Sequence, residues 1–510
     1  MAFIYLNNRR VVYEKKFSKK LDDFFGIKKS GSEIKIEIFA GLATFLAMAY
    51  ILTVNPNNIL FGGQSDPRWS SVFIATALGA GIGTLLMALF AKMPLAQAPG
   101  MGLNATIGGV IGGTLGFSYS FGNAMMIVLI SGLIFLMLSL MPAGKDKMGR
   151  KISVREKIFD GMPKEIRNAI PVGIGLFIAL IGMKNANIVV SNKWTLLQLV
   201  DLTDKANWVS NGIARNAVVA LFGLMVISIL SHYKVKGSVI LGILSATLLA
   251  LPLGVTNIDI LLGKTDGITW AFLDSFKNFF SMNPEKGGIF LSCFTEGFIF
   301  PKGSLMTTVM LVMTFLMIDM FDTMGTIVGC CCNAKLVDKE GKPKNYDKIM
   351  NSDSIATVSG ALLGTSTVTT FVESGAGVAE GGKTGLTALV VALLFFASIF
   401  LLPIFAFIPS QAVSSALIYV GVLMMSNIKN IDFSNIRYAV PAFLTIVMMP
   451  LTYSITNGIG IGVIAYFIIN IIIYLIDKFR KVENNKLNIS IVTFIITVLF
   501  LIYFLVPTVF

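Results

Sequence analysis

The sequence predicts an all-α polytopic membrane protein with a seven-plus-seven inverted repeat, and three observations lead to this fold class. First, 55% of the 510 residues are apolar and only 14% are charged, whereas soluble globular proteins carry roughly a quarter charged residues. Second, apolar segments long enough to cross a bilayer recur along the chain. Third, the two halves share a sequence pattern. Four cysteines in a chain of this length exclude a disulfide-stapled secreted fold.

The apolar segments predict fourteen spans up to Ile476, because a transmembrane helix needs about 20 mostly apolar residues. Clear spans are expected at 37–59, 71–91, 122–141, 168–184, 214–232, 237–253, 304–332, 384–407, 411–427, 436–455 and 458–476. The stretch 94–117 predicts one interrupted span, and 351–382 predicts a short helix followed by an interrupted span. A further apolar segment, 488–507, is long enough to form an additional C-terminal span.

The placement of basic residues predicts the orientation of these spans. The chain carries 41 Lys and Arg against 28 Asp and Glu, a net charge of +13. Most of the basic residues fall in segments that face the cytoplasm if the N-terminus is inside, as the positive-inside rule requires. The excess is therefore explained without a nucleic-acid partner. We expect a multi-pass protein of the plasma (inner) membrane with a basic cytoplasmic segment at 1–35, and an external C-terminus if 488–507 crosses.

An internal repeat supports an inverted architecture. Residues 74–84 and 355–365 read IATALGAGIGT and IATVSGALLGT, and seven of eleven positions are identical. Shorter matches flank this block in the same order. An odd number of spans per repeat inverts the second copy relative to the first. Two inverted copies of seven spans are typical of a transporter rather than of a receptor or a simple pore.

The third span of each predicted repeat is interrupted by polar and small residues. The interruptions cover 96–105 and 366–377, and each has a short extended-favouring stretch followed by a glycine pair. Irregular backbone at membrane depth is tolerated only where protein or a water-filled cavity satisfies its polar groups. The paired interruptions therefore indicate a substrate site, with half-helix starts after Gly102 and Gly375 that would offer free N–H groups. The alternative is close helix packing through the glycines.

Acidic residues inside the predicted spans add a second feature to this site. Asp319 and Asp322 share one face of the eighth span with Thr326, and Glu373 lies in the second interruption. A charged side chain at mid-bilayer costs roughly 2.5–3.5 kcal/mol and is functional by default. Acceptor-only carboxylates match the N–H groups of a nucleobase, and a buried carboxylate could carry a coupling proton. Asp322 could instead be a structural partner that locks span 8 to its neighbours.

Six stretches together carry a resemblance to a known family. They are GLATFLAMAYILTVNP (41–56), QAPGMGLNA (97–105), RNAIPVGIGLFIALIG (167–182), FDTMGTIVG (321–329), ALLGTSTVTTFVESGAGVAEGGKTGLTALV (361–390) and PAFLTIVMMPLTYSITNGIGIG (441–462). In these stretches the chain resembles the AzgA-like hypoxanthine/guanine/adenine permeases of the nucleobase/ascorbate (xanthine/uracil permease) transporter superfamily. The match runs over most of 35–476 and leaves out the first 35 residues and 488–510.

The resemblance implies a division into two domains. A core domain would comprise spans 1–4 (36–141) and 8–11 (304–407), with short strands in spans 3 and 10. A gate domain would comprise spans 5–7 (168–253) and 12–14 (411–476). The purine would lie between the strands and span 8, and similar proteins are proton symporters that work as homodimers with an elevator-like movement of the core.

The resemblance also implies roles for individual residues. Asp319 and Glu373 look like the main base-binding carboxylates, with Asn104, Gly102 and Gly375 as further substrate contacts. Asp322, Thr323 and Thr326 would support the site or couple the proton. The chain has Thr106 and Ile107 where an aromatic residue is expected after Asn104 and Ala105, which argues against a stacking contact from that position.

Other functions are weighed against a purine permease. A uracil, xanthine or anion transporter of the same fold is the first alternative, but an anion carrier would favour a basic residue at Glu373. A channel would not need paired interruptions. A membrane-embedded aspartyl protease would use two opposed aspartates, and no second transmembrane aspartate is expected to face Asp319 and Asp322 from another span. We therefore expect a secondary active transporter that is not an enzyme, with H⁺ as the coupling ion and no cofactor or metal.

Overall fold

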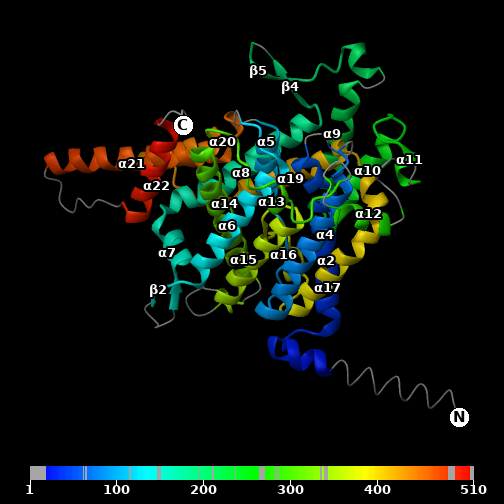
Figure 1. Ribbon diagram of the computed structural model, residues 1–510, viewed down its shortest axis with the longest axis horizontal. Coiled ribbons are helices and arrows are strands. Elements are labelled where there is room, and N and C mark those ends of the chain that lie inside the picture. Colours follow the sequence, from blue (N-terminus) through cyan, green and yellow to red (C-terminus); the bar gives the residue numbers. More distant parts are fainter. Residues whose placement is uncertain are drawn as a thin grey trace.

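The computed structural model describes residues 19–60, 63, 66–113, 117–145, 151–192, 194–209, 212–235, 237–262, 270, 272–281, 283, 287–333, 336–337, 343–480 and 489–505. Most of them are helical (Figure 1). The helices before residue 300 are α2 (Ile34–Met48), α3 (Ile51–Ile59), α4 (Trp69–Leu86), η3 (Met87–Ala91), α5 (Met101–Ile111), α6 (Phe121–Leu140), α7 (Val154–Gly161), α8 (Lys164–Asn185), α9 (Ile213–His232), α10 (Ser238–Ala250), α11 (Ile258–Leu261), α12 (Phe272–Phe279) and α13 (Ser292–Thr295).

The second half of the chain has the corresponding set of helices. They are α14 (Leu305–Asn333), α15 (Tyr346–Leu363), α16 (Ser374–Ala379), α17 (Gly385–Ser398), α18 (Leu402–Ala406), α19 (Ser410–Met425), α20 (Ile436–Leu451), α21 (Ile455–Phe479) and α22 (Ile491–Leu505). Nine helical segments of the described residues are long and apolar enough to cross a membrane, and α5, α10, α20 and α22 are shorter apolar helices. The chain is therefore a multi-pass membrane protein.

Three pairs of short antiparallel strands accompany the helices in the part of the chain that the structure describes. They are β1 (Gln97–Pro99) with β6 (Val368–Thr370), β2 (Pro142–Lys145) with β3 (Lys151–Ser153), and β4 (Val189–Asn192) with β5 (Leu196–Leu199). Only β1 and β6 come from the two interrupted spans, so the predicted strands of spans 3 and 10 are confirmed. The β4–β5 hairpin projects at one end of the molecule, opposite the N-terminal residues 19–31 (Figure 1).

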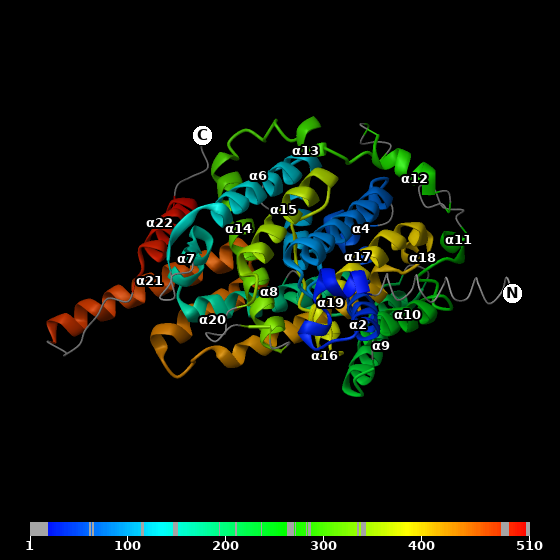
Figure 2. The same cartoon turned by 90° about the horizontal axis from the view of Figure 1, so that it is seen from below.

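The helices pack into two groups. The strand-bearing group contains β1, β6 and the helices α2–α6 and α14–α17, where α15 packs on α4 and α6, and α17 packs on α2 and α4. The flanking group contains α8–α10 and α19–α21, where α19 packs on α8 and α9, and α20 packs on α8 and α21. Figure 2 shows α19, α20 and α8 running alongside the strand-bearing helices. Both groups draw helices from both halves of the chain, as an inverted repeat requires.

The internal repeat brings its two copies into contact. Residues 74–84 lie in α4, residues 355–363 of the second copy lie in α15, and the two helices pack on each other. The small residues of this repeat allow the approach: a Cβ on Gly83 would lie 3.0 Å from the Cβ of Ala356. The equivalent strands then pair antiparallel, which is the relation expected between inverted copies.

Within the segment 488–507, the described residues Ile491–Leu505 form α22, which packs against α21 of the flanking group, α14 of the strand-bearing group and α7. The face of α22 that packs against the protein consists of the buried side chains of Thr493, Ile496, Thr497 and Phe500. Large apolar side chains such as Ile491 and Leu505 are exposed on the other side, as expected for a helix in contact with lipid. An external C-terminus stays a prediction.

Candidate substrate site

The β1–β6 pair lies where the two interrupted spans meet. Gln97 opposes Thr370, Ala98 opposes Thr369 and Pro99 opposes Val368. Two further backbone bonds extend the pairing on either side, from Gly100 N to Thr367 O at 2.9 Å and from Phe371 N to Ala96 O at 3.0 Å. Both strands are completely buried. The polar backbone of each interruption is thus satisfied largely by the other.

The half-helices that follow the strands begin slightly earlier than predicted. Helix α5 begins at Met101 and α16 at Ser374, rather than after Gly102 and Gly375. Among the described residues, the amides of Met101, Gly102 and Leu103 have no hydrogen-bond acceptor. They are the donors that a helix N-terminus offers to a ligand.

At α16 the expectation of free amides is wrong. The amides of Ser374, Gly375 and Ala376 donate to the carbonyls of Phe371, Val372 and Glu373. The physical reason is that residues 371–376 form a tight turn, which consumes the donors that an abrupt strand-to-helix transition would leave free. Only the first half-helix keeps its donors.

Asp319 lies in the middle of α14, and its side chain is buried with 1% exposure. Thr357 donates a hydrogen bond to its Oδ2 at 3.1 Å, and Thr323 lies 3.4 Å from its Oδ1. Hydroxyl groups from α15 and from the next turn of α14 therefore surround this carboxylate. A carboxylate has about four acceptor positions, so these contacts do not exhaust its capacity.

Thr323 joins Asp319 to a second buried carboxylate. Its hydroxyl lies 2.9 Å from Asp353 Oδ1 and 2.6 Å from the hydroxyl of Thr369 on β6. Gln97 of β1 donates to the same oxygen of Asp353 at 3.0 Å. Thr323 and Asp353 thus connect α14, α15 and the strand pair in one polar network.

Asp353 corrects a prediction. No second transmembrane aspartate was expected to face span 8, yet Asp353 of α15 is completely buried beside Thr323. The sequence predicts a short helix that begins at residue 351, where Asp353 resembles an ordinary helix-end charge, whereas α15 begins at Tyr346 and places Asp353 inside the helix. Asp353 differs from the partner in a protease dyad because Arg155 lies 3.2 Å from its Oδ2 and pairs with its charge.

Glu373 is half-buried at the start of α16. Tyr50, at the junction between α2 and α3, donates a hydrogen bond to Glu373 Oε1 at 2.5 Å. Sequence reasoning missed Tyr50 because a tyrosine inside an apolar span is usually a packing residue. The break between α2 and α3 at Ala49 and Tyr50 brings its hydroxyl to the second interruption.

Asp322 is also half-buried, and it lies one turn from Asp319 on α14. No described residue donates a hydrogen bond to its carboxylate, although Glu373 and Asp353 interact with it electrostatically. A structural lock would show such a bond, so the described contacts do not support that interpretation. Thr326 is buried one turn further along the helix.

The three remaining predicted residues have different surroundings. Asn104 is fully buried, and it accepts from the hydroxyl of Ser366 and donates to Pro99 O at 3.3 Å. It therefore ties α5 to the second interruption. A Cβ on Gly102 would lie 2.9 Å from Ile174 of α8, so Gly102 faces the flanking group. A Cβ on Gly375 would meet only Cys330 Sγ, at 3.9 Å.

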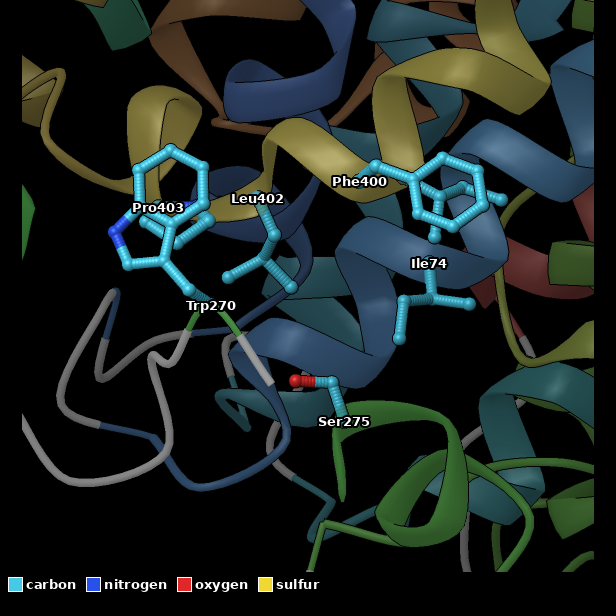
Figure 3. Close-up of a pocket in the computed structure, with 7 residues that line it drawn as sticks. Ile74, Trp270, Ser275, Phe400, Leu402 and Pro403 are labelled. Carbon is cyan, nitrogen blue, oxygen red and sulfur yellow. The ribbon is translucent and has the colours of Figure 1, made fainter. Parts of the chain in front are cut away.

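A small cavity lies between α5, α14 and the α20–α21 junction. It holds about 20 Å³, room for roughly one water molecule, and Thr106, Leu311 and Tyr453 line it. The described arrangement is therefore closed on this side of the site. A second depression, shown in Figure 3, is lined by Ile74, Trp270, Ser275, Phe400, Leu402 and Pro403 and has no carboxylate.

Residues 377–384 read GVAEGGKT and match the letter pattern of a nucleotide-binding P-loop. A P-loop connects a strand to a helix, whereas this segment connects α16 to α17. The carboxylate of Glu37 accepts from the amides of Lys383 at 3.0 Å and Thr384 at 3.2 Å. An acidic side chain thus takes the place that a phosphate would need, and the segment is a helix connection.

The comparisons with known proteins place the chain in a family. The model of a permease family, named for xanthine and uracil permeases, matches residues 35–461. A putative permease of Methanocaldococcus jannaschii is 38% identical, with 89% of this chain and 93% of that protein covered. The adenine permease AdeQ of Escherichia coli is 35% identical, with 91% of this chain and 94% of AdeQ covered. The guanine/hypoxanthine permease PbuO of Bacillus subtilis is 36% identical, with 87% of this chain and 93% of PbuO covered.

Solved structures agree with the fold. The transmembrane domain of the cyanobacterial bicarbonate transporter BicA superposes with a TM-score of 0.56 and 17% identity, covering 84% of this chain and 97% of that one. SLC26A9 superposes with a TM-score of 0.54 and 10% identity, covering 91% and 70%. At these identities the likeness concerns the seven-plus-seven fold alone. The family model and the relatives show more: the chain belongs to the nucleobase/ascorbate permease family, whose members are transporters and not enzymes.

Proposed function

We propose that this protein imports purine nucleobases such as guanine, hypoxanthine or adenine across the plasma membrane as a proton symporter. The observation that carries the proposal is the convergence of carboxylates from α14 and α16 beside a strand pair and a half-helix N-terminus. The similarity of this chain to the adenine permease AdeQ and to the guanine/hypoxanthine permease PbuO supports it. The opposing arrangement of donors and acceptors suits a planar heterocycle with N–H groups on one edge and ring nitrogens or a carbonyl on another.

The acceptor side of the proposed site is formed by Glu373 and Asp319. Glu373 uses one oxygen for Tyr50, and its second oxygen is available to a ring N–H group. Asp319 is enclosed by threonines in the described conformation, so we propose that a small shift of α14 against β6 opens it to the base. Asp322, without a hydrogen-bond partner among the described residues, supports the acceptor side.

The donor side is the start of α5. The unpaired amides of Met101, Gly102 and Leu103 would bind the carbonyl or ring nitrogens of the purine. The side of Gly102 where a side chain would start faces Ile174 of the flanking group, so these amides lie at the contact between the two groups. Asn104 holds the half-helix in place through Ser366 and Pro99, so its proposed role is to position these amides.

We propose that the strand-bearing group is the moving core and the flanking group is the gate. Core and gate would correspond to 36–141 with 304–407 and to 168–253 with 411–476. Small residues at the contact between the two groups favour sliding, as at Gly102 against Ile174 and Ile455. An elevator movement would carry the strand pair and its carboxylates across the membrane together. We also propose that two copies of the chain form a homodimer through their gates. The N-terminus would lie in the cytoplasm.

A uracil, xanthine or anion transporter is the second candidate, since the fold is shared with a bicarbonate transporter. The acidic residues argue against an anion, because Arg155 is paired with Asp353 and leaves no free cation among the described site residues. Uptake of labelled hypoxanthine, adenine and guanine in cells that lack purine transport tests the proposal. Competition that is stronger with unlabelled uracil or bicarbonate than with purines would contradict it.

A second prediction concerns the driving force. Purine uptake should rise as the external pH falls and should collapse when a protonophore is added, because proton binding neutralises buried carboxylates before the core moves. The measurement is initial uptake at several external pH values with and without the protonophore. Sodium-dependent uptake that survives the protonophore would replace the proton by another ion.

A third prediction concerns Tyr50. Tyr50→Phe removes the hydroxyl that donates to Glu373 at 2.5 Å and leaves the ring in place. A hydrogen bond to a charged group contributes about 1.5–3 kcal/mol, so the KM for purine should rise roughly tenfold or more while protein abundance stays normal. Tyr503→Phe, in α22, is the matched control. An unchanged KM in Tyr50→Phe would show that Glu373 is positioned by other contacts.

A further inference from the structure

Arg155 is an arginine whose side chain is buried inside the protein. It lies on α7, in the connector between α6 of the strand-bearing group and α8 of the flanking group. Its side chain is 1% exposed, and its guanidinium lies 3.2 Å from Asp353 Oδ2 and 3.4 Å from the centroid of the Phe135 ring. One guanidinium nitrogen also donates to Ser139 at 3.3 Å.

The helix that carries Arg155 is held at its other end as well. Hydroxyl groups of Ser490 and Thr493 donate to the carbonyl of Gly161, the last residue of α7. A Cβ on Gly161 would lie 2.8 Å from a methyl carbon of Val492, so the contact with the start of α22 is close. The connector is therefore fixed at both ends, which keeps the arginine in place.

Asp353 passes the effect of this arginine to the site. Its Oδ2 faces Arg155, and its Oδ1 is shared by Gln97 at 3.0 Å and Thr323 at 2.9 Å. The Thr323 hydroxyl lies between this oxygen and Asp319 Oδ1, and its distance to Asp319 Oδ1 is 3.4 Å. A threonine hydroxyl has a single proton to donate, so it cannot serve both carboxylates at once.

The charge balance decides which carboxylate receives that proton. The titratable groups that face this network are Asp319, Asp322, Glu373 and Tyr50. Arg155 is the only cation within ion-pair distance of these carboxylates or of Asp353 among the described residues. A buried charge is stable only when it is paired. Asp353 is the paired one, so it is the carboxylate that stays ionised and attracts the hydroxyl.

We propose that Arg155 is a positioning residue that sets the direction of this hydrogen-bond chain. Arg155 keeps Asp353 ionised, Thr323 donates a hydrogen bond to Asp353, and the oxygen of Thr323 is left to accept a hydrogen bond from the protonated carboxyl group of Asp319. Asp319, rather than Asp353, then carries the exchangeable proton. The link to proton coupling rests on the proposed function, whereas the assignment of the proton to Asp319 is a property of the protein alone.

Infrared spectroscopy of the purified full-length protein tests the assignment without substrate. Protonated carboxyl groups have a C=O stretch that ionised carboxylates lack. Arg155→Gln should add such a band, because Asp353 loses its partner and takes up a proton. The added band should be absent in the double variant that combines Arg155→Gln with Asp353→Asn. Arg155→Lys keeps the charge and should add none.

Asp353→Asn is the variant with the opposite expected effect. It leaves Arg155 without its partner and frees Thr323 to donate to Asp319, so the protonated band of Asp319 should disappear. Arg167→Gln is the matched control, because Arg167 pairs with the exposed Asp160 of the same connector at 3.4 Å. If Arg155 and Asp353 form a purely structural ion pair, the spectra of Arg155→Gln and Asp353→Asn should both match the wild-type spectrum. That result would overturn the inference.

Transport provides the second readout. Uptake by Arg155→Gln should fall at least tenfold at normal abundance, its pH profile should move, and Arg155→Lys should retain more uptake than Arg155→Gln. Arg167→Gln should stay within twofold of the wild type. If the wild type takes up no purine, the proposed function fails while the spectra still decide the role of Arg155. If the wild type transports and the pH profile of Arg155→Gln is unchanged, only the present inference fails.

Discussion

Asp319→Asn and Glu373→Gln are each expected to abolish purine uptake while membrane abundance stays near the wild-type level. Each substitution keeps the size of the side chain and replaces a carboxyl group by an amide, which can neither ionise nor release a proton. Loss of a hydrogen bond to a charged group costs about 1.5–3 kcal/mol, which corresponds to roughly a 10-fold to 150-fold loss of affinity. Removal of a proton carrier acts on top of this loss.

The two substitutions should differ in their residual behaviour. Glu373 is half-buried and its second carboxylate oxygen has no side-chain partner among the described residues, so Glu373→Gln should lose purine binding by the purified protein. Asp319 is enclosed by Thr357 and Thr323, so Asp319→Asn should retain weak binding but lose pH-dependent uptake. Glu380→Gln, at the end of α16, is the matched control and should transport normally. Wild-type uptake by both site variants would show that the proposed site is wrong.

Gly377→Ala is expected to reduce uptake at least tenfold and to lower the amount of folded protein. A Cβ at this position would lie 2.5 Å from the carbonyl oxygen of Ala40 and would overlap the hydroxyl of Thr44. Both neighbours belong to α2, so relief of the overlap requires α16 to move away from it. That movement displaces Glu373, which immediately precedes α16.

Gly375→Ala is the control for this substitution. Its Cβ would meet only a sulfur at 3.9 Å, an ordinary van der Waals contact, and alanine favours a helix by about 1 kcal/mol over glycine. Folded protein should therefore be recovered at wild-type yield or better. Detergent-solubilised yield and purine uptake are measured for both variants. Equal loss of folded protein in both would mean that the contact with α2 does not limit packing.

Hydropathy and spacing identified the features of this protein that depend on local sequence. Whether a segment can span a bilayer depends on the composition of about 20 consecutive residues, and the described helices coincide with the expected spans. The matching blocks at 74–84 and 355–365 indicated an inverted repeat, and the packing of α4 on α15 agrees with it. The two interruptions, with Glu373 in the second, were also visible as local breaks in an apolar pattern.

The partners of the site residues were decided by the tertiary structure. Tyr50 and Glu373 are 323 positions apart, and Arg155 and Asp353 are 198 apart. A tyrosine or an acidic residue near a helix end has the same local sequence whether it packs, meets water or joins a buried network. Their roles follow from which helices cross at the strand pair, and that crossing depends on packing across the whole chain.

The amides at the two half-helix starts show the same division between sequence and structure. Both interruptions have a glycine pair, and the sequence by itself predicts equivalent donors. The structure leaves the donors free at α5 but uses them in a turn at α16. The sequence determined that two broken spans meet at membrane depth, since their backbone groups need partners there. The packing of each half-helix against its neighbours decided which of those groups pair with protein and which face a substrate.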